Sequence, residues 1–176
     1  MGWNCTIAVV HDASLADLVP LGWTPTTESV AWDEATGSGF EGIAGWERDG
    51  DVILASGGPD LVDAVERLGR VGPVHLGLFM SVTDVHVWET AGPVGRRTWS
   101  WTVDGPAVDE GAPHPAEAGI ERLDEDTLFD LLAAGGLAYD ERLEEATFVV
   151  LETGLPDPGA VAGPPARRRK KRFGLF

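Results

Sequence analysis

The stretch from Val74 to Val103 carries the strongest hydrophobic pattern in the chain. Its first seven residues are almost all apolar, which is typical of a strand that is covered on both faces. Apolar and polar residues then alternate in two further runs, so one side of each run faces a core. We therefore expect three antiparallel strands at the centre of the fold, at residues 74–80, 85–88 and 99–103, with a turn at 81–84 and a hairpin at Gly92, Pro93 and Gly95.

The rest of the chain alternates short strand-like runs with a few helical ones. A helix over 58–69 has apolar residues at helical spacing, Pro59 in its first turn and Gly69 at its end. The Asp49-Gly50 pair tolerates positive φ and predicts a hairpin. The other expected strands are 6–10, 29–32, 42–46, 52–56 and 147–151. The other expected helices begin near Ser14, at Asp124 or Asp126, and near Tyr139.

Two segments lack periodicity and are rich in proline and glycine. Residues 104–119 predict a long polar loop, and residues 154–166 predict an extended linker. The sequence therefore predicts one acidic α+β domain over 1–153, with a mainly antiparallel sheet and two or three helices. The linker 154–166 and a basic tail, 167–176, follow this domain.

The charge of the chain is divided unevenly between body and tail. The 176 residues include 29 acidic and 13 basic ones, a net charge of −16. Six of the basic residues lie in 167–172, which leaves seven basic against 29 acidic residues in 1–166, a net charge of −22. An acidic surface repels phosphates, so nucleic-acid binding through the body is not expected.

Cys5 is the only cysteine of the chain, and it lies beside the apolar run Ile7 to Val10. We therefore expect the Cys5 side chain to be small and buried, and no internal disulfide can form. The N-terminus lacks the pattern of a signal peptide, and no apolar run approaches a membrane span. These features predict a cytoplasmic protein, with the inner face of the membrane as the alternative location for peripheral attachment.

Several local motifs together resemble a known group of sequences. They are Met1-Gly2 before the first strand, Ser81-Val82-Thr83-Asp84 between central strands, and the basic-aromatic end at 167–176. In these motifs the chain resembles an uncharacterised family of proteins from high-GC Gram-positive bacteria, known only as a domain of unknown function. The chain departs from this family in its short 104–119 loop and its Ala/Gly-rich second helix. The resemblance implies no activity, so it assigns no functional residue.

Four histidines raise the question of a metal site, although none forms an HxH or HxxxH pair. His11, Asp12, Asp84 and His86 would approach one metal ion if their strands were neighbours. The alternative is that they cap strand ends and face water, and we expect no metal and no cofactor. Asp84, His86 and Trp88 share one face of a strand, which makes them a candidate ligand-binding face.

The predicted long loop also carries Asp109, Glu110 and His114, which are the best-placed residues for carboxylate chemistry. Adjacent carboxylates arise by chance in so acidic a chain, so a catalytic role is not expected. P-loop and G-x-S-x-G motifs are absent from the sequence.

The tail is the most informative functional stretch. Six cations stand next to three large apolar side chains, a combination that suits an anionic and partly apolar surface such as a cytoplasmic lipid leaflet. The residues expected to bind are Arg167, Arg168, Arg169, Lys170, Lys171, Arg172, Phe173, Leu175 and Phe176.

Three alternatives for the tail remain open. The ending Leu175-Phe176 resembles peptides that dock on the bacterial DNA sliding clamp, although Arg172 stands where these peptides have glutamine. The tail can also bind nucleic acid, or lie against its own acidic body. The sequence thus predicts a non-catalytic binding or adaptor protein attached through its tail, with a protein-docking tail or a metal-dependent enzyme as alternatives. It does not predict an oligomeric state.

Overall fold

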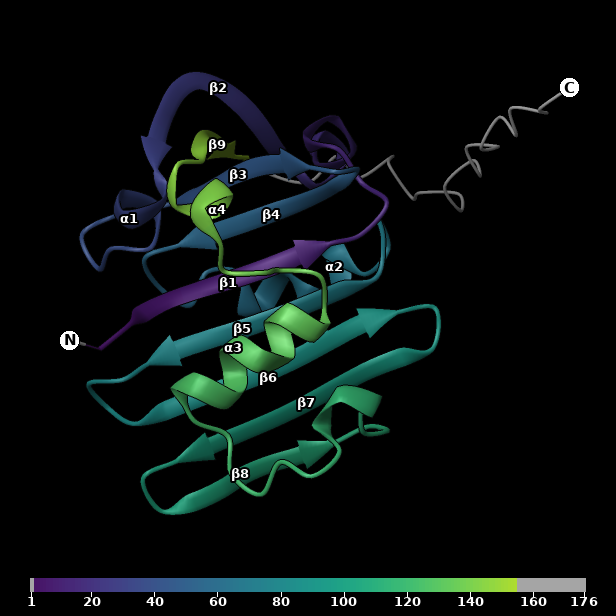
Figure 1. Ribbon diagram of the computed structural model, residues 1–176. Coiled ribbons are helices and arrows are strands. Elements are labelled where there is room, and N and C mark those ends of the chain that lie inside the picture. Colours follow the sequence, from purple (N-terminus) through teal and green to yellow (C-terminus); the bar gives the residue numbers. More distant parts are fainter. Residues whose placement is uncertain (1, 155–176) are drawn as a thin grey trace, which may run out of the picture.

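The computed structural model describes residues 2–154, and its main feature is a single large β-sheet (Figure 1). The strands are β1 (Asn4–Val10), β2 (Trp23–Ala31), β3 (Ile43–Arg48), β4 (Asp51–Ser56), β5 (Val74–Met80), β6 (Val85–Gly92), β7 (Gly95–Thr102), β8 (Gly105–Glu110) and β9 (Thr147–Thr153). They follow the order β2-β9-β3-β4-β1-β5-β6-β7-β8, and every neighbouring pair is antiparallel. The predicted mainly antiparallel sheet is therefore confirmed.

The helices are short, and only α3 is longer than seven residues. The α-helices are α1 (Trp32–Ala35), α2 (Val65–Leu68), α3 (Glu125–Ala134) and α4 (Glu141–Glu144), and the 3-10 helices are η1 (Leu15–Leu21), η2 (Val62–Ala64) and η3 (Pro115–Glu117). Nine strands with these helices make the fold richer in sheet than the sequence prediction.

The middle of the sheet is β1, which has β4 on one side and β5 on the other. Its residues from Cys5 to Val10 are buried without exception. This explains why the run is continuously apolar, because both faces of β1 are covered. The expected strand trio forms β5, β6 and β7, with the predicted turn and hairpin, but it lies toward the β8 edge and not at the centre.

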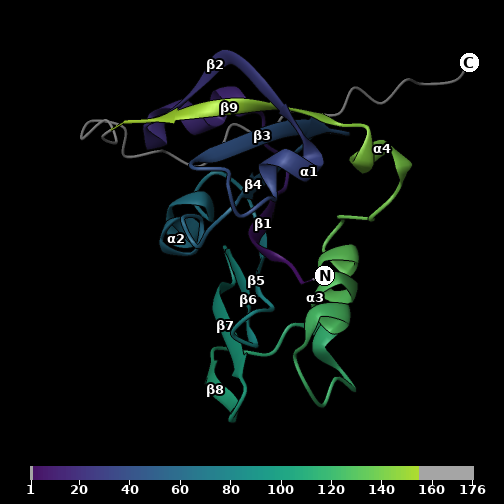
Figure 2. The same ribbon diagram turned by 90° about the vertical axis from the view of Figure 1, so that its left-hand side faces the viewer.

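Successive side chains of the sheet enter two separate cores. Ile7, Val9, Phe79 and Trp88 pack with leucines of α3 on one face. Ala8, Val10 and Leu76 and the leucines around α2 form the core on the other face. Figure 2 shows α2 and α3 on opposite sides of the sheet. The two-residue period predicted these alternations because it follows directly from strand geometry.

Helix α3 is the longest helix, and the sequence predicted its start. The Asp124 carboxylate accepts a hydrogen bond from the backbone N–H of Thr127, so it caps the helix. Leu128, Leu131 and Leu132 face the sheet and are buried. Gly77 lets the helix approach closely, since a Cβ at this position would lie 3.0 Å from Leu132 Cδ1.

Three sequence predictions were wrong in detail. Residues 104–119 are not a structureless loop, because they contain edge strand β8, where Pro106 is tolerated, and η3. β2 begins at Trp23, six residues before the expected strand at 29–32, and its polar composition reflects its place at the other sheet edge. The expected helix 58–69 is split into η2 and α2, and its first turn closes through bonds three residues apart.

Two further predictions match the observed structure. The Asp49-Gly50 turn joins β3 to β4, with φ of 55° at Asp49 and 95° at Gly50. Cys5 is fully buried, and burial raises the pKa of its thiol to about 12. The linker and tail predicted for 154–166 and 167–176 lie outside the described residues, apart from Gly154. No helix within 2–154 is both long enough and apolar enough to cross a bilayer.

Candidate functional site

The four residues predicted as possible metal ligands fall into two separated pairs. His11 and Asp12 follow β1 at the end where Val10 pairs with Val74. Asp84 and His86 lie near the opposite end, where Asn4 pairs with Met80. The length of a seven-residue strand, about 20 Å, separates the two pairs. The structure therefore does not bring them together. Within residues 2–154, no group of three or more His, Cys, Asp or Glu side chains is arranged to hold a metal ion.

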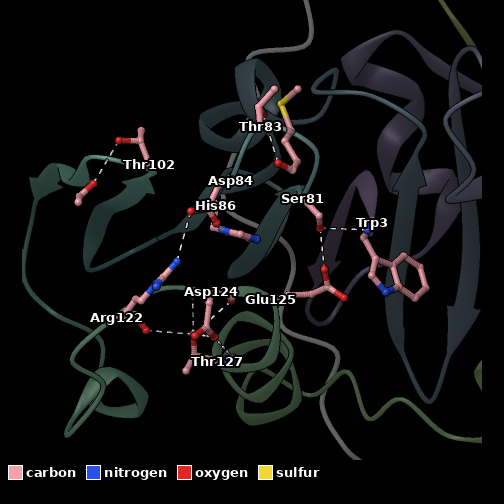
Figure 3. Close-up of polar contacts among 12 residues, drawn as sticks. Trp3, Ser81, Thr83, Asp84, His86, Thr102, Arg122, Asp124, Glu125 and Thr127 are labelled. Atoms are coloured by element: carbon pink, nitrogen blue, oxygen red, sulfur yellow. Dashed lines mark hydrogen bonds and ion pairs between the residues drawn. The ribbon is translucent and has the colours of Figure 1, made fainter. Parts of the chain in front are cut away.

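The predicted ligand-binding face, Asp84, His86 and Trp88, is mostly interior. His86 is 3% exposed and Trp88 is fully buried, so neither presents an open surface. Both ring nitrogens of His86 lack a hydrogen-bond partner, and burial lowers its pKa. Only Asp84 remains half-buried, with one carboxylate oxygen 3.9 Å from His86 Nδ1 and the other 3.3 Å from Arg122 Nη2 (Figure 3).

Asp84 and its neighbours instead fasten the end of the sheet to α3. The Ser81 hydroxyl donates to Glu125 at 2.6 Å and accepts from the backbone N–H of Trp3 at 3.0 Å (Figure 3). Asp84 adopts φ of 51°, which the turn between β5 and β6 requires. These contacts join the first strand, the turn and the helix, so this end of the molecule is structural in character.

The opposite end of the sheet holds a cluster that the sequence prediction did not assemble, here called the histidine corner. It consists of His11, Asp51, His75, Trp88 and His114. His11 follows β1, Asp51 opens β4, His75 lies in β5 and His114 precedes η3. The topology brings these distant segments together because β1 lies between β4 and β5.

A chain of hydrogen bonds runs through the histidine corner. His11 Nδ1 lies 3.0 Å from Asp51 Oδ2, and His11 Nε2 lies 3.0 Å from His75 Nδ1. A carboxylate only accepts, so the Asp51 contact assigns a proton to His11 Nδ1. His11 Nε2 of the neutral ring is then the acceptor for His75 Nδ1–H, which also lies 3.3 Å from the Gly135 carbonyl. The contacts thus fix both tautomers.

His75 is the most perturbed group of the corner. Burial, which is the largest cause, and the neighbouring His11 and His114 together lower its pKa to about 4, while the Gly135 carbonyl opposes the shift. Its ring is stacked on Trp88 with 5.6 Å between centroids and 4° between planes. Gly135 leaves room for this ring, because a Cβ there would lie 2.7 Å from it. The corner therefore keeps His75 neutral at physiological pH.

His114 connects the corner to an open cleft of about 430 Å³, here called the His114 cleft. Its ring lies 5.1 Å from that of His75, centroid to centroid, and 6.1 Å from that of Trp88. The backbone N–H of Ala116 donates to His114 Nδ1 at 3.2 Å, which fixes the ring. The residues that shape the cleft include Arg97, Trp99, Asp109, His114, Glu117 and Ile120.

The back of the cleft is built on an ion network in which Arg97 and Glu117 are buried and Asp109 is exposed. Arg97 Nε lies 3.1 Å from both Glu117 oxygens, and its Nη2 donates to Glu117 at 2.7 Å. Its Nη1 donates to Asp109 and to the Glu110 carbonyl. Hydrogen bonding to Glu117 raises the pKa of Arg97. The guanidinium is therefore engaged by acceptors of the protein itself. It forms a wall of the cleft and is not a free anion-binding site.

The exposed carboxylate of the cleft is Asp109, whose side chain is 69% exposed although it is paired with Arg97. Pro113, Pro115 and Ile120 provide apolar surface around it, and Trp99 lies at the base under Arg97. An exposed carboxylate beside apolar walls suits a cationic group attached to an apolar body. On this geometry we place the candidate functional site in the His114 cleft.

Comparison with known proteins finds no matching family model, no matching curated protein and no matching solved structure. The resemblance to a family of high-GC Gram-positive bacteria therefore stays a prediction. Sequence reasoning had already singled out Asp109, Glu110 and His114, and the structure brings Asp109 and His114 to one cleft. It missed His75, Arg97 and Glu117, because only the register of β5 and β7 and the position of η3 place them together.

Proposed function

We propose that this protein is a non-catalytic binding protein whose basic-aromatic tail attaches its acidic body to an anionic membrane surface. The body presents the His114 cleft to a partner, and the tail provides attachment at the cytoplasmic face of the membrane. The observation that carries the proposal is the division of charge, −22 in residues 1–166 against six cations in 167–172.

The arginines of the body support this division, because most are already neutralised. Five of the seven in 2–154 are engaged by carboxylates of the body, so they add little attraction toward lipid phosphates. These five are Arg48, Arg96, Arg97, Arg122 and Arg142. Attraction to an anionic surface must then come from the tail.

The strength expected of the tail suits reversible attachment. Each cation near an anionic leaflet contributes on the order of 1 kcal/mol, and ordering of the tail offsets part of the sum. Phe173, Leu175 and Phe176 add burial at the interface. The body opposes the attraction through its own negative charge. Attachment should therefore be transient and sensitive to salt, since the Debye length is about 8 Å at physiological ionic strength.

Vesicle co-sedimentation tests this function. We expect the full chain to sediment with anionic vesicles, and a chain ending at Ala166 to lose at least about tenfold in partition, because several kcal/mol are removed. Neutral vesicles and raised salt should release the full chain. Replacing Phe173, Leu175 and Phe176 with Ala keeps the charge and should weaken binding by a smaller amount.

Equal sedimentation of the full and shortened chains with anionic vesicles would contradict membrane attachment. A protein-docking tail ending in Leu175-Phe176 would then be the better proposal, tested by its binding to the sliding clamp. The enzyme alternative needs His11, Asp12, Asp84 and His86 in one place, and β1 and β5 separate them by a strand length. No observation favours it over binding.

A further inference from the structure

We propose that the histidine corner is a proton relay, in which a proton taken up at His75 Nε2 leaves a positive charge on His11 beside Asp51. The relay uses neither the tail nor the His114 cleft, so it does not depend on the proposed function. Three observations carry it: the hydrogen-bonded chain of the corner, the access of solvent to its outer nitrogen, and the position of its carboxylate.

The hydrogen-bonded chain of the corner runs in one direction. His11 Nδ1 donates to Asp51 Oδ2 at 3.0 Å, and His75 Nδ1 donates to His11 Nε2, also at 3.0 Å. Each neutral ring therefore carries its proton on Nδ1 and a lone pair on Nε2. Both shared protons point toward Asp51, so the chain is oriented to pass a proton from His75 to His11.

The outer end of the chain is His75 Nε2, and solvent reaches this atom. Within residues 2–154 it has no hydrogen-bond partner, because both contacts of the ring involve Nδ1. It is also not one of the fully buried polar atoms that lack a partner in this part of the chain. Both ring nitrogens of His86 are of that buried kind. A proton from water can therefore bind directly to His75, whereas His86 is closed to it.

The relay step transfers one proton and breaks no bond between heavy atoms. A proton from solvent binds at His75 Nε2, and the Nδ1 proton of His75 moves to His11 Nε2. His11 is then an imidazolium that donates to Asp51 through Nδ1 and to His75 through Nε2. His75 is again neutral, with its proton on Nε2 and its lone pair on Nδ1. The Gly135 carbonyl, 3.3 Å from His75 Nδ1, loses its donor in this state.

The charge settles on His11 because the carboxylate of the corner lies there. Asp51 is in direct contact with His11, and an opposite charge at this distance stabilises an imidazolium. His75 lies between two other histidines, and the segment after α3 meets the rings with the uncharged Gly135 and Gly136. Burial and the two neighbouring histidines lower the pKa of His75 to about 4. His11 therefore holds the first proton, and His75 becomes charged only in a second step.

The other charged groups beside Asp51 leave this order unchanged. Arg48 and Asp49 line a small cavity next to it. Arg48 is already paired with Asp140 at 2.6 Å and lies 3.6 Å from Asp49, so its charge is compensated outside the corner. Asp12 contacts Asp51 through its backbone N–H, at 3.0 Å from Oδ1. The carboxylate of Asp51 therefore remains available to an imidazolium.

Proton uptake changes what the corner offers to a ligand. His75 Nε2 is a hydrogen-bond acceptor before the step and an N–H donor after it. The His114 ring lies 5.1 Å from His75 and accepts the Ala116 N–H through Nδ1, so its own proton is on Nε2 when it is neutral. The two rings then present one acceptor and one donor before the step, and two donors after it. A carbonyl or carboxylate oxygen can accept from His75 only in the protonated corner.

Long-range proton–nitrogen correlation by nuclear magnetic resonance, on the full chain, tests the relay because it shows which nitrogen of each ring carries the proton. We expect His75 to carry its proton on Nδ1 at neutral pH and on Nε2 once His11 is an imidazolium. This change should occur above the pH of about 4 at which His75 itself becomes charged. A neutral His75 that keeps its proton on Nδ1 while His11 is charged would overturn the proposal. So would a His75 that becomes charged before His11.

Asp51→Asn and Asp12→Asn form a matched pair of variants. Each removes one negative charge at this end of the sheet, but only Asp51 contacts His11 through its side chain. Asparagine also tolerates the φ of 53° at Asp12. We expect the pH of the tautomer change to fall by at least about one unit in Asp51→Asn and by less than about half a unit in Asp12→Asn. Equal shifts would overturn the proposal, and the tautomers of the unchanged protein decide it even if Asp51→Asn does not fold.

Discussion

Replacing Arg97 with Met is expected to lower the free energy of unfolding by about 3–5 kcal/mol. The Arg97 and Glu117 side chains are only 4% and 6% exposed, and three of the arginine's hydrogen bonds end on Glu117. Removal of the cation leaves the Glu117 carboxylate buried without its counter-charge. It also leaves Asp109 without its anchor at the cleft. Urea or guanidinium unfolding monitored by tryptophan fluorescence measures the loss.

Arg142→Met is the matched control for this substitution. Arg142 pairs with Asp49 at 3.3 Å, but the two side chains are more than half exposed, so the expected loss is below about 1 kcal/mol. A second comparison is Arg97→Met combined with Glu117→Leu, which removes both charges and should recover much of the stability. Equal, small losses for Arg97→Met and Arg142→Met would contradict the buried network.

Replacing Trp88 with Ala is expected to lower the free energy of unfolding by about 3–5 kcal/mol. Trp88 is fully buried in β6, with His75 stacked on it and Trp99 directly across on β7. The truncation opens a cavity between the sheet and the segment that carries His114. Denaturant unfolding measures this loss, and the near-ultraviolet circular dichroism of the tryptophans should change with it.

Val82→Ala provides the contrast for Trp88. Val82 lies in the turn between β5 and β6 and is 80% exposed, so its truncation should change stability by less than about 0.5 kcal/mol. If Trp88→Ala cost as little as Val82→Ala, Trp88 would face solvent. That result would favour the predicted ligand-binding face of Asp84, His86 and Trp88 over a core role for Trp88.

Much of the sheet could be predicted because strand periodicity depends only on local sequence. β1, β5, β6 and β7 all follow from their apolar runs and alternation, and the turns between them follow from glycine, proline and Asp-Gly pairs. The edge strand β8 was missed, and only the end of the edge strand β2 was predicted, because an edge strand has one partner and little buried surface. The sequence of an edge strand is therefore often polar and can contain proline, as the sequence of a loop does.

The site was less predictable because it depends on register. His11 and His75 are 64 residues apart, and they meet because Val10 pairs with Val74 at the end of β1. Arg97 meets Glu117 because η3 folds back over β7. The sequence identified Asp109 and His114 as chemically suitable, but it placed them on a loop and not beside a cleft. The tail residues lie outside the described part, so their role stays a proposal.

The histidine corner should make the fold sensitive to acid. His75 has a pKa of about 4 in the folded chain, below the value of about 6.5 expected for an unfolded histidine. Between these values the unfolded chain binds more protons at this histidine. The free energy of unfolding therefore falls as pH drops from about 6.5 to about 4, and the contribution of His75 levels off below. Burial lowers the pKa of His86 too, which acts in the same direction.

Imidazole titration by nuclear magnetic resonance, on the full chain, tests the structure of the site most directly. The four histidines can be assigned by single replacements, with His75→Gln identifying the central resonance of the corner. Burial of the His75 ring, with His11 and His114 beside it, predicts that His75 titrates with a pKa of about 4. A His75 pKa near the ordinary value of about 6.5 would contradict the corner and the cleft wall built on it.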